Sequence, residues 1–141
     1  MLVRLLYASR VAPGVDGDAL ASIVRQSQQH NAECGVTGVL CCSGGLFMQV
    51  LEGGRTVVNR LYNRIVADPR HSDVELLSYE EIGERRFAGW AMGQVDLATL
   101  NPALLLKYSE TAMLDPYSVS GQASMALFEE LAATAAVCGP G

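Results

Sequence analysis

The sequence lacks the features that mark several large classes of protein. Its ten basic residues are scattered without forming a run, and the formal net charge is -5. Proteins that bind the phosphate backbone of nucleic acid usually carry a clustered basic face. No stretch of the chain approaches the roughly 18 consecutive apolar residues of a membrane span. We therefore expect neither nucleic acid nor a membrane among the partners.

Cysteine is scarce, and its spacing does not suit a metal. The four cysteines form no CxxC pair, and the two adjacent ones would point to opposite faces of a strand. We expect no metal site. The N-terminal segment carries Arg4, Tyr7 and Ser9 where a signal sequence would be continuously apolar, so we expect none. The expected compartment is the cytoplasm, with free thiols.

What the chain does have is a large share of apolar residues. Half of its 141 residues are hydrophobic and only 18% are charged, so a full core can form and intrinsic disorder is excluded. The length allows one domain of ordinary size with a small appendage.

The apolar pattern predicts an ordered series of strands and helices. Strands are predicted at residues 2–10, 36–42, 46–52, 74–82 and 90–95. Helical spacing predicts one helix at 19–34, capped by Asp16 or Asp18, and a second after Gly54 that Pro69 stops near Ala67 or Asp68. The order βαββαβ with one extra strand is the ferredoxin-like α+β pattern. Right-handed crossovers then place both helices on one face of the sheet.

The opposite face of this sheet is too apolar to lie in water, because strands 2–10 and 46–52 both present apolar side chains there. Further helices predicted at 103–107 and 124–137 can cover it, and so can a second copy of the chain. We expect both to contribute. The predicted organisation is a core at 1–97 and a helical extension of two helices at 98–141, hinged at the Asn101-Pro102 and Asp115-Pro116 breaks.

One polar residue lies in the middle of an apolar strand. Burying the Gln49 amide without a partner would cost roughly 2–7 kcal/mol. Tyr7 lies on a neighbouring strand and its phenol also needs a partner if that face is buried. We expect the two side chains to meet between the helices, where the amide can turn over and exchange its oxygen for its nitrogen. A purely structural glutamine remains the alternative.

Both predicted helices become polar toward their C-terminal ends, which is typical of the lining of a slot, although helices also end polar where they reach solvent. The residues concerned are Ser27 and Asn31 in the first helix, Arg64 and Asp68 in the second, and Arg70 and His71 just beyond it. Ile23 and Ile65 would form aliphatic walls. Alternation places Trp90 and Met92 on one face of the last strand.

Such a slot suits a flat heteroaromatic ligand with a phosphate tail, for which a flavin or a nucleotide qualifies. The glycine pairs of the chain match neither the dinucleotide-binding nor the P-loop spacing. Side chains would therefore contact the phosphates.

Several segments together resemble the BLUF domains, which are blue-light sensors that use flavin. The resemblance covers roughly residues 2–95 and rests on 5–9 (LLYAS), 27–31 (SQQHN), 35–40 (GVTGVL), 47–53 (FMQVLEG), 68–71 (DPRH) and 85–92 (RRFAGWAM). The tail, including LLKYS at 105–109, is similar to that of short stand-alone members, which carry two C-terminal helices and no enzymatic output domain.

The resemblance implies a photoreceptor rather than an enzyme, with a flavin bound non-covalently: FAD, or alternatively FMN or riboflavin. Tyr7 would donate an electron to the photoexcited flavin, and Gln49 would lie between that tyrosine and the ring. Asn31 would hold the carbonyl and amide edge, and Arg64, Asp68, Arg70 and His71 would line the ring edge and phosphate side. Ser27, Trp90 and Met92 would lie behind these, with Trp90 and Met92 relaying the signal to a downstream protein partner. We also expect a homodimer.

Two other classes of function compete with this interpretation. The first is an acylphosphatase-like hydrolase on the same fold, for which the segment from Arg10 to Pro13 offers only a weak anion-binding loop. The second is a colourless interaction module that uses the apolar face of its sheet. Yellow colour, with a red shift under blue light, would separate the photoreceptor from both.

Overall fold

The computed structural model describes residues 1–43, 45–96 and 101–133. The elements follow one another as β1 (Leu2–Val11), α1 (Gly17–Cys34), β2 (Thr37–Ser43), β3 (Leu46–Gly54), α2 (Arg55–Ala67), β4 (His71–Ile82), β5 (Gly93–Asp96), α3 (Pro102–Tyr108) and α4 (Gly121–Ala133). This confirms the predicted order. The fold is the ferredoxin-like α+β arrangement with an extra strand.

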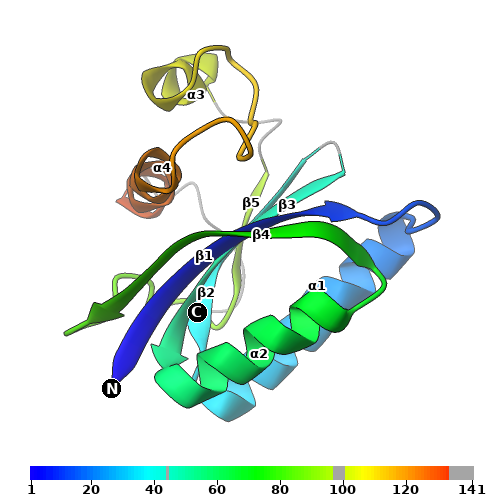
Figure 1. The fold of residues 1–141 in the computed structure, drawn as a ribbon, viewed down its shortest axis with the longest axis vertical. Helices are drawn as coiled ribbons and strands as arrows, with labels where there is room; N and C mark the ends of the chain where they lie inside the picture. The colour runs from blue at the N-terminus through cyan, green and yellow to red at the C-terminus, as the bar shows by residue number, and fades with distance from the viewer. Residues whose placement is uncertain (44, 97–100, 134–141) are drawn as a thin grey trace.

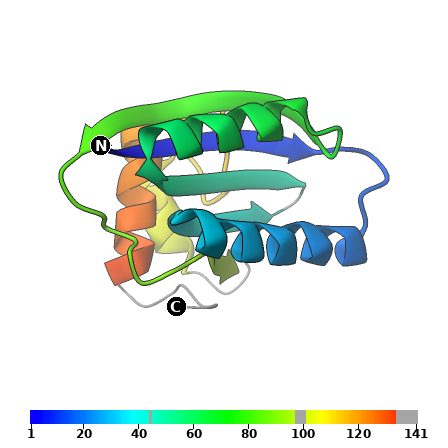
Figure 2. The same cartoon turned by 90° about the horizontal axis from the view of Figure 1, so that it is seen from below.

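One five-stranded sheet, in the order β4-β1-β3-β2-β5, forms the middle layer. Strand β5 runs parallel to β2, whereas the other neighbours are antiparallel. Helices α1 and α2 lie along one face, and α3 and α4 lie on the other (Figure 1). Seen from the helix side, α2 runs along β4 and β1 while α1 lies toward β2 (Figure 2). The sheet therefore carries a separate core on each face.

Local chemistry explains the ends of α1. The Asp16 carboxylate accepts a hydrogen bond of 2.8 Å from the backbone N–H of Ala19, which caps the first turn. Gly35 ends the helix in the left-handed region, at φ 71°, and its N–H bonds to the Asn31 carbonyl. Asn31 is thereby fixed in the last turn, on the face that meets the sheet.

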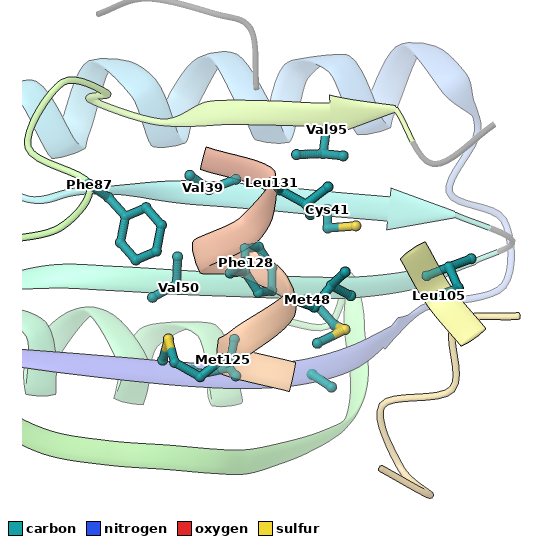
Figure 3. Packing of buried hydrophobic residues seen from close by; sticks show 13 residues of the cluster. Val39, Cys41, Met48, Val50, Phe87, Val95, Leu105, Met125, Phe128 and Leu131 are labelled. Atoms are coloured by element: carbon teal, nitrogen blue, oxygen red, sulfur yellow. The ribbon is translucent and has the colours of Figure 1, made fainter. Parts of the chain in front are cut away.

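The C-terminal helices cover the apolar face of the sheet, as predicted. Figure 3 shows Phe128 and Leu131 of α4 above the strands that carry Met48 and Val39, and all four belong to one buried cluster. Leu105 of α3 joins the same cluster. Helix α4 begins at Gly121, three residues before the predicted start, and residues 134–137 of the predicted helix lie outside the described part. The contribution of a second copy stays a prediction.

The predicted strand 90–95 is wrong at its start, because β5 begins only at Gly93. The residues before it form a loop whose backbone groups bond elsewhere: the Trp90 carbonyl accepts from Gly38 N–H at 2.9 Å. As a result Trp90 and Met92 do not share a face. Met92 is buried in the core beneath α1 and α2, and Trp90 packs against the cluster on the opposite side.

Candidate functional site

A cleft of about 240 Å³ opens between α1 and α2 above the sheet, close to the lower end of ligand-pocket volumes, about 300 Å³. All the residues that the sequence indicated for binding line it: Tyr7, Ile23, Ser27, Asn31, Gln49, Arg64, Ile65, Asp68, Arg70 and His71. Residues from three strands, two helices and the turn after α2 thus converge on one cleft. Their individual roles stay predictions at this point.

The floor of the cleft holds the expected tyrosine and glutamine in contact. Tyr7 and Gln49 face each other across the β1–β3 ladder, and the phenol donates a hydrogen bond of 2.5 Å to Gln49 Oε1. Burial raises the pKa of Tyr7 far above its usual value, and the neighbouring Tyr62 and Asp68 add to the rise. The phenol is therefore protonated at physiological pH and acts as the donor.

That bond also fixes how the Gln49 amide is turned. With Oε1 accepting from Tyr7, the amide nitrogen faces Met92 and donates to its thioether sulfur at 3.2 Å. Gln49 is 4% exposed and Met92 is fully buried. The three side chains form a continuous buried row, Tyr7 to Gln49 to Met92, in which each polar atom has one defined partner.

Asn31 presents an unsatisfied acceptor to the cleft. Its Nδ2 donates to the Ala91 carbonyl at 3.3 Å, while Oδ1 is the only buried side-chain oxygen or nitrogen in the described part of the chain that has no hydrogen-bond partner. An unpaired buried acceptor typically costs about 1–3 kcal/mol, so a ligand N–H at this position would be strongly favoured. The imide N–H of a flavin ring is such a donor. The residues of the cleft therefore fit a flavin.

The mouth of the cleft carries the charged residues. Arg70 donates to Asp68 through Nη2 at 2.6 Å and through Nε at 3.0 Å, and this hydrogen bonding lowers the pKa of the Asp68 carboxyl. Arg64 lies across the opening, with Nη1 3.4 Å from the Nε2 of His30. Two guanidinium groups at the rim suit a phosphate.

His71 closes one end of the cleft as a neutral ring. Its Nδ1 lies 2.8 Å from the Ser9 hydroxyl, and its ring centroid lies 5.0 Å from that of Phe47. Burial lowers the pKa of His71, which outweighs the opposite effect of the Asp68 charge. The imidazole is thus uncharged at neutral pH, and charge is confined to the rim.

Some lining residues were not predicted from the sequence: Gln26, His30, Leu40, Phe47 and Leu61. Phe47 and Leu61 could have been found, because Phe47 alternates with Gln49 on its strand and Leu61 lies on the apolar stripe of α2. His30 carried no such signal. Gln28 was also missed, and it donates to the Met92 carbonyl at 3.2 Å. Trp90 and Met92 do not line the cleft themselves.

The described residues contain neither a metal-binding cluster nor a membrane-spanning helix. Among residues 1–43, 45–96 and 101–133, no cluster of three or more histidine, cysteine or acidic side chains could hold a metal ion. Within the same ranges, none of the helices has the length and apolar character needed to cross a membrane.

Residues 2–93 match the family described as sensors of blue-light using FAD, the BLUF domains. The photoactivated adenylate cyclase subunit beta of Euglena longa is 35% identical over 105 residues, which are 72% of this chain and 12% of that protein. The blue light- and temperature-regulated antirepressor BluF of Escherichia coli K12 is 32% identical over 97 residues, 69% of this chain and 24% of that protein. The chain thus spans less than a quarter of these relatives' length.

Solved structures agree over most of the chain. BlsA in its photo-activated state has a TM-score of 0.83 at 30% identity, covering 94% of this chain and 95% of that one. BlrB in its dark state has a TM-score of 0.77 at 34% identity, covering 94% and 96%. Klebsiella pneumoniae BlrP1 with FMN and cyclic diGMP has a TM-score of 0.67 at 36% identity, covering 73% and 28%. The chain belongs to the BLUF family, and its matched domain is a blue-light sensor that uses flavin rather than an enzyme.

Proposed function

We propose that this chain is a blue-light photoreceptor in which Tyr7 supplies an electron and a proton and Gln49 records the event as a changed hydrogen bond. The observation that carries the proposal is the buried bond from the Tyr7 phenol to Gln49 Oε1, at 2.5 Å on the floor of the cleft. The flavin, when bound, supplies the absorption of blue light and the acceptance of an electron.

The surroundings of Tyr7 suit a reversible transfer. The phenol is 1% exposed and neutral, so no charge has to be stripped of water before the step. Once Tyr7 has given up an electron, its hydroxyl proton leaves along the existing bond to Gln49 Oε1. Return of the electron and the proton restores Tyr7, so no covalent bond forms and no atom is consumed.

The hydrogen bonds of Gln49 can then change in two ways, by rotation of the amide or by its tautomerisation. If the amide turns over, its nitrogen faces Tyr7 and its oxygen faces Met92 Sδ. A thioether sulfur accepts hydrogen bonds weakly and cannot donate one, so the 3.2 Å contact with Met92 is lost. A tautomer of the amide would weaken the same contact by removing an N–H. Either change reaches Met92 directly.

The energy stored in such a rearrangement is that of about one hydrogen bond to a buried group, on the order of 1–3 kcal/mol. A difference of about 1.4 kcal/mol changes a two-state equilibrium about tenfold. A single turned amide is therefore sufficient to shift the population of a nearby bistable element.

The remaining cleft residues would hold the flavin. Asn31 would take the ring's imide edge through its free oxygen, between aliphatic walls from Ile23 and Ile65 and beside Ser27. Arg64, together with the Asp68–Arg70 pair and His71, would line the ring edge and the phosphate side. FAD is the proposed form, because the family is described by that cofactor and the rim offers two guanidinium groups.

We further propose that the signal leaves through a helical extension comprising residues 98–141, reaching a protein partner, and that the chain acts as a homodimer in the cytoplasm. The packing of α3 and α4 on the sheet supports the first point. Free thiols at Cys34, Cys41 and Cys42 are typical of that compartment.

The test is an absorbance spectrum of the purified, flavin-loaded chain before and after blue light. We expect a small red shift that decays in darkness. Tyr7→Phe and Gln49→Leu should keep the flavin and lose the shift, whereas Tyr79→Phe, which alters an exposed tyrosine on β4, should behave like the wild type. A chain that cannot be loaded with flavin, or a shift that survives in either of the first two variants, contradicts the proposal.

A further inference from the structure

The segment from Arg86 to Met92 passes from one face of the sheet to the other. At its start, Phe87 reaches into the cluster covered by α4 (Figure 3). At its end, Met92 lies beneath α1 in contact with Gln49. Trp90, in between, lines a hollow with Glu129 and Ala132 of α4. The segment is thus a connection outside the sheet that touches both the photochemical row and the C-terminal helices.

The two ends of the segment are held differently. The backbone N–H groups of Arg86 and Phe87 both donate to the Glu52 carboxylate, at 3.0 and 2.7 Å. At the other end, the Ala91 and Met92 carbonyls each accept one bond from a neutral amide of α1, at 3.3 and 3.2 Å. Bonds to an ionised acceptor are shorter and about twice as strong as neutral ones. The Arg86 end is therefore the firmer one.

Glu52 itself is held in place by an ion pair within the sheet. It is fully buried on β3, and its charge is met by the buried Arg4 of β1, whose Nε and Nη2 both lie 2.8 Å from Oε2. A carboxylate enclosed in this way is stable only if it is paired and fully hydrogen-bonded. Since both residues lie in the central strands of the sheet, the carboxylate holds a constant position relative to Gln49, three residues earlier on β3.

We propose that Glu52 is a positioning residue for the photoresponse. Its carboxylate holds the backbone of Arg86 and Phe87 in place. When the Met92–Gln49 contact is lost, the segment therefore rotates about this fixed end and Trp90 moves against α4. The inference rests on the proposed function, because the movement starts at Gln49. The side-chain ion pair between Arg86 and Glu129 ties the pinned end to α4 as well. The fixed point and the moving indole thus contact the same helix.

The first test is residue-resolved amide exchange of the flavin-loaded wild type. The amides of Arg86 and Phe87 should be protected equally in darkness and under blue light, while the amide of Met92 should exchange faster in the light. Exchange at Arg86 and Phe87 in darkness as fast as at the exposed Glu84 would overturn the proposal, and so would light-dependent exchange at both of them.

The second test compares Glu52→Gln with Glu80→Gln. The glutamine introduced by Glu52→Gln would offer one oxygen and one NH₂ group, so at least one bond to Arg86, Phe87 or Arg4 is lost. Glu80 is the matched control, because it bonds the same Arg4 at 2.8 Å, whereas the N–H groups of Arg86 and Phe87 bond to Glu52. Trp90 is the only tryptophan of the chain and reports on the segment by its fluorescence.

Glu52→Gln should keep the flavin and the red shift, shift the dark emission of Trp90, and recover in darkness about tenfold faster, which corresponds to about 1.4 kcal/mol of lost restraint. Glu80→Gln should recover at the wild-type rate. Equal recovery and equal Trp90 emission in both variants would overturn the inference while leaving the photoreceptor proposal intact. A wild type without a red shift would instead contradict the proposed function. If Glu52→Gln does not fold, the exchange test on the wild type decides alone.

Discussion

The bond between Tyr7 and Gln49 can be tested by a double-mutant cycle on stability. Tyr7→Phe keeps the ring but removes the hydroxyl, so Gln49 Oε1 loses its partner at a position that is 4% exposed. Gln49→Leu keeps a similar volume and strands the Tyr7 hydroxyl in the same way. Leaving one buried polar group unpaired costs about 1–3 kcal/mol, whereas removing both partners is nearly neutral. The double variant should therefore be less destabilised than the sum of the singles, by about 1–2 kcal/mol.

Urea unfolding in darkness, at the same saturating flavin concentration for all four proteins, measures the cycle. A fixed excess of flavin is needed because a ligand of the folded state adds to its apparent stability. Equal slopes with urea would show that the unfolded states are comparable. Additivity of the two single effects within about 0.5 kcal/mol would refute the reasoning, since residues that share no interaction behave in that way. None of the three variants should show the red shift.

Three further predictions follow from the packing and the charges. Phe128→Ala removes a fully buried ring of α4 and should lower the free energy of unfolding by about 3–5 kcal/mol, measured in urea; an unchanged midpoint would contradict the role of α4 as a cover. Asn31→Ala should raise the dissociation constant for flavin about tenfold in a titration, and Gln29→Ala, an exposed neighbour on α1, should not. Because burial lowers the pKa of His71, the unfolded chain binds its proton more readily. Stability from this residue is therefore fully present above about pH 6.5 and is lost as the pH falls below that value, and His71→Gln should flatten that part of the urea midpoint profile.

The parts of the site that could be predicted from the sequence are those governed by short-range periodicity. A period of two places Gln49 on the face of Phe47 and Leu51, and antiparallel pairing then brings it opposite Tyr7. A period of about 3.6 carries the apolar stripe of α1 on to Asn31. The amphipathic stripes of α1 and α2, together with the apolar second face of the sheet, were sufficient to predict both layers of helices.

The parts that could not be predicted depend on partners distant in the chain. The sequence 90–95 alternates like a strand, but the N–H groups of Arg86 and Phe87 bond to Glu52, 34 and 35 residues earlier, and this turns the chain across the sheet before pairing begins at Gly93. Strand β4 begins at His71, three residues before the predicted start at residue 74, because of its pairing with β1. Asp73 has a φ of 50° and the β1–β4 register shifts nearby, so the strand continues through an irregularity that propensity does not reveal.

The distribution of charge explains why a light-driven rearrangement should involve neutral buried side chains and leave the ion pairs in place. Tyr7, Gln49, Met92 and the neutral His71 carry no charge, so they can exchange hydrogen bonds without desolvating an ion. Two ionic pairs lie outside this row: Arg70 with Asp68 at the mouth of the cleft, and the buried Arg4 with Glu52 on the opposite face of the sheet. Breaking a buried ion pair would strand a charge at a cost of about 3–5 kcal/mol, more than one rearranged neutral bond can supply. A turned amide therefore has enough energy to displace Met92 and its neutral contacts but not the Glu52 anchor, and the displacement has to be taken up between Ala88 and Met92.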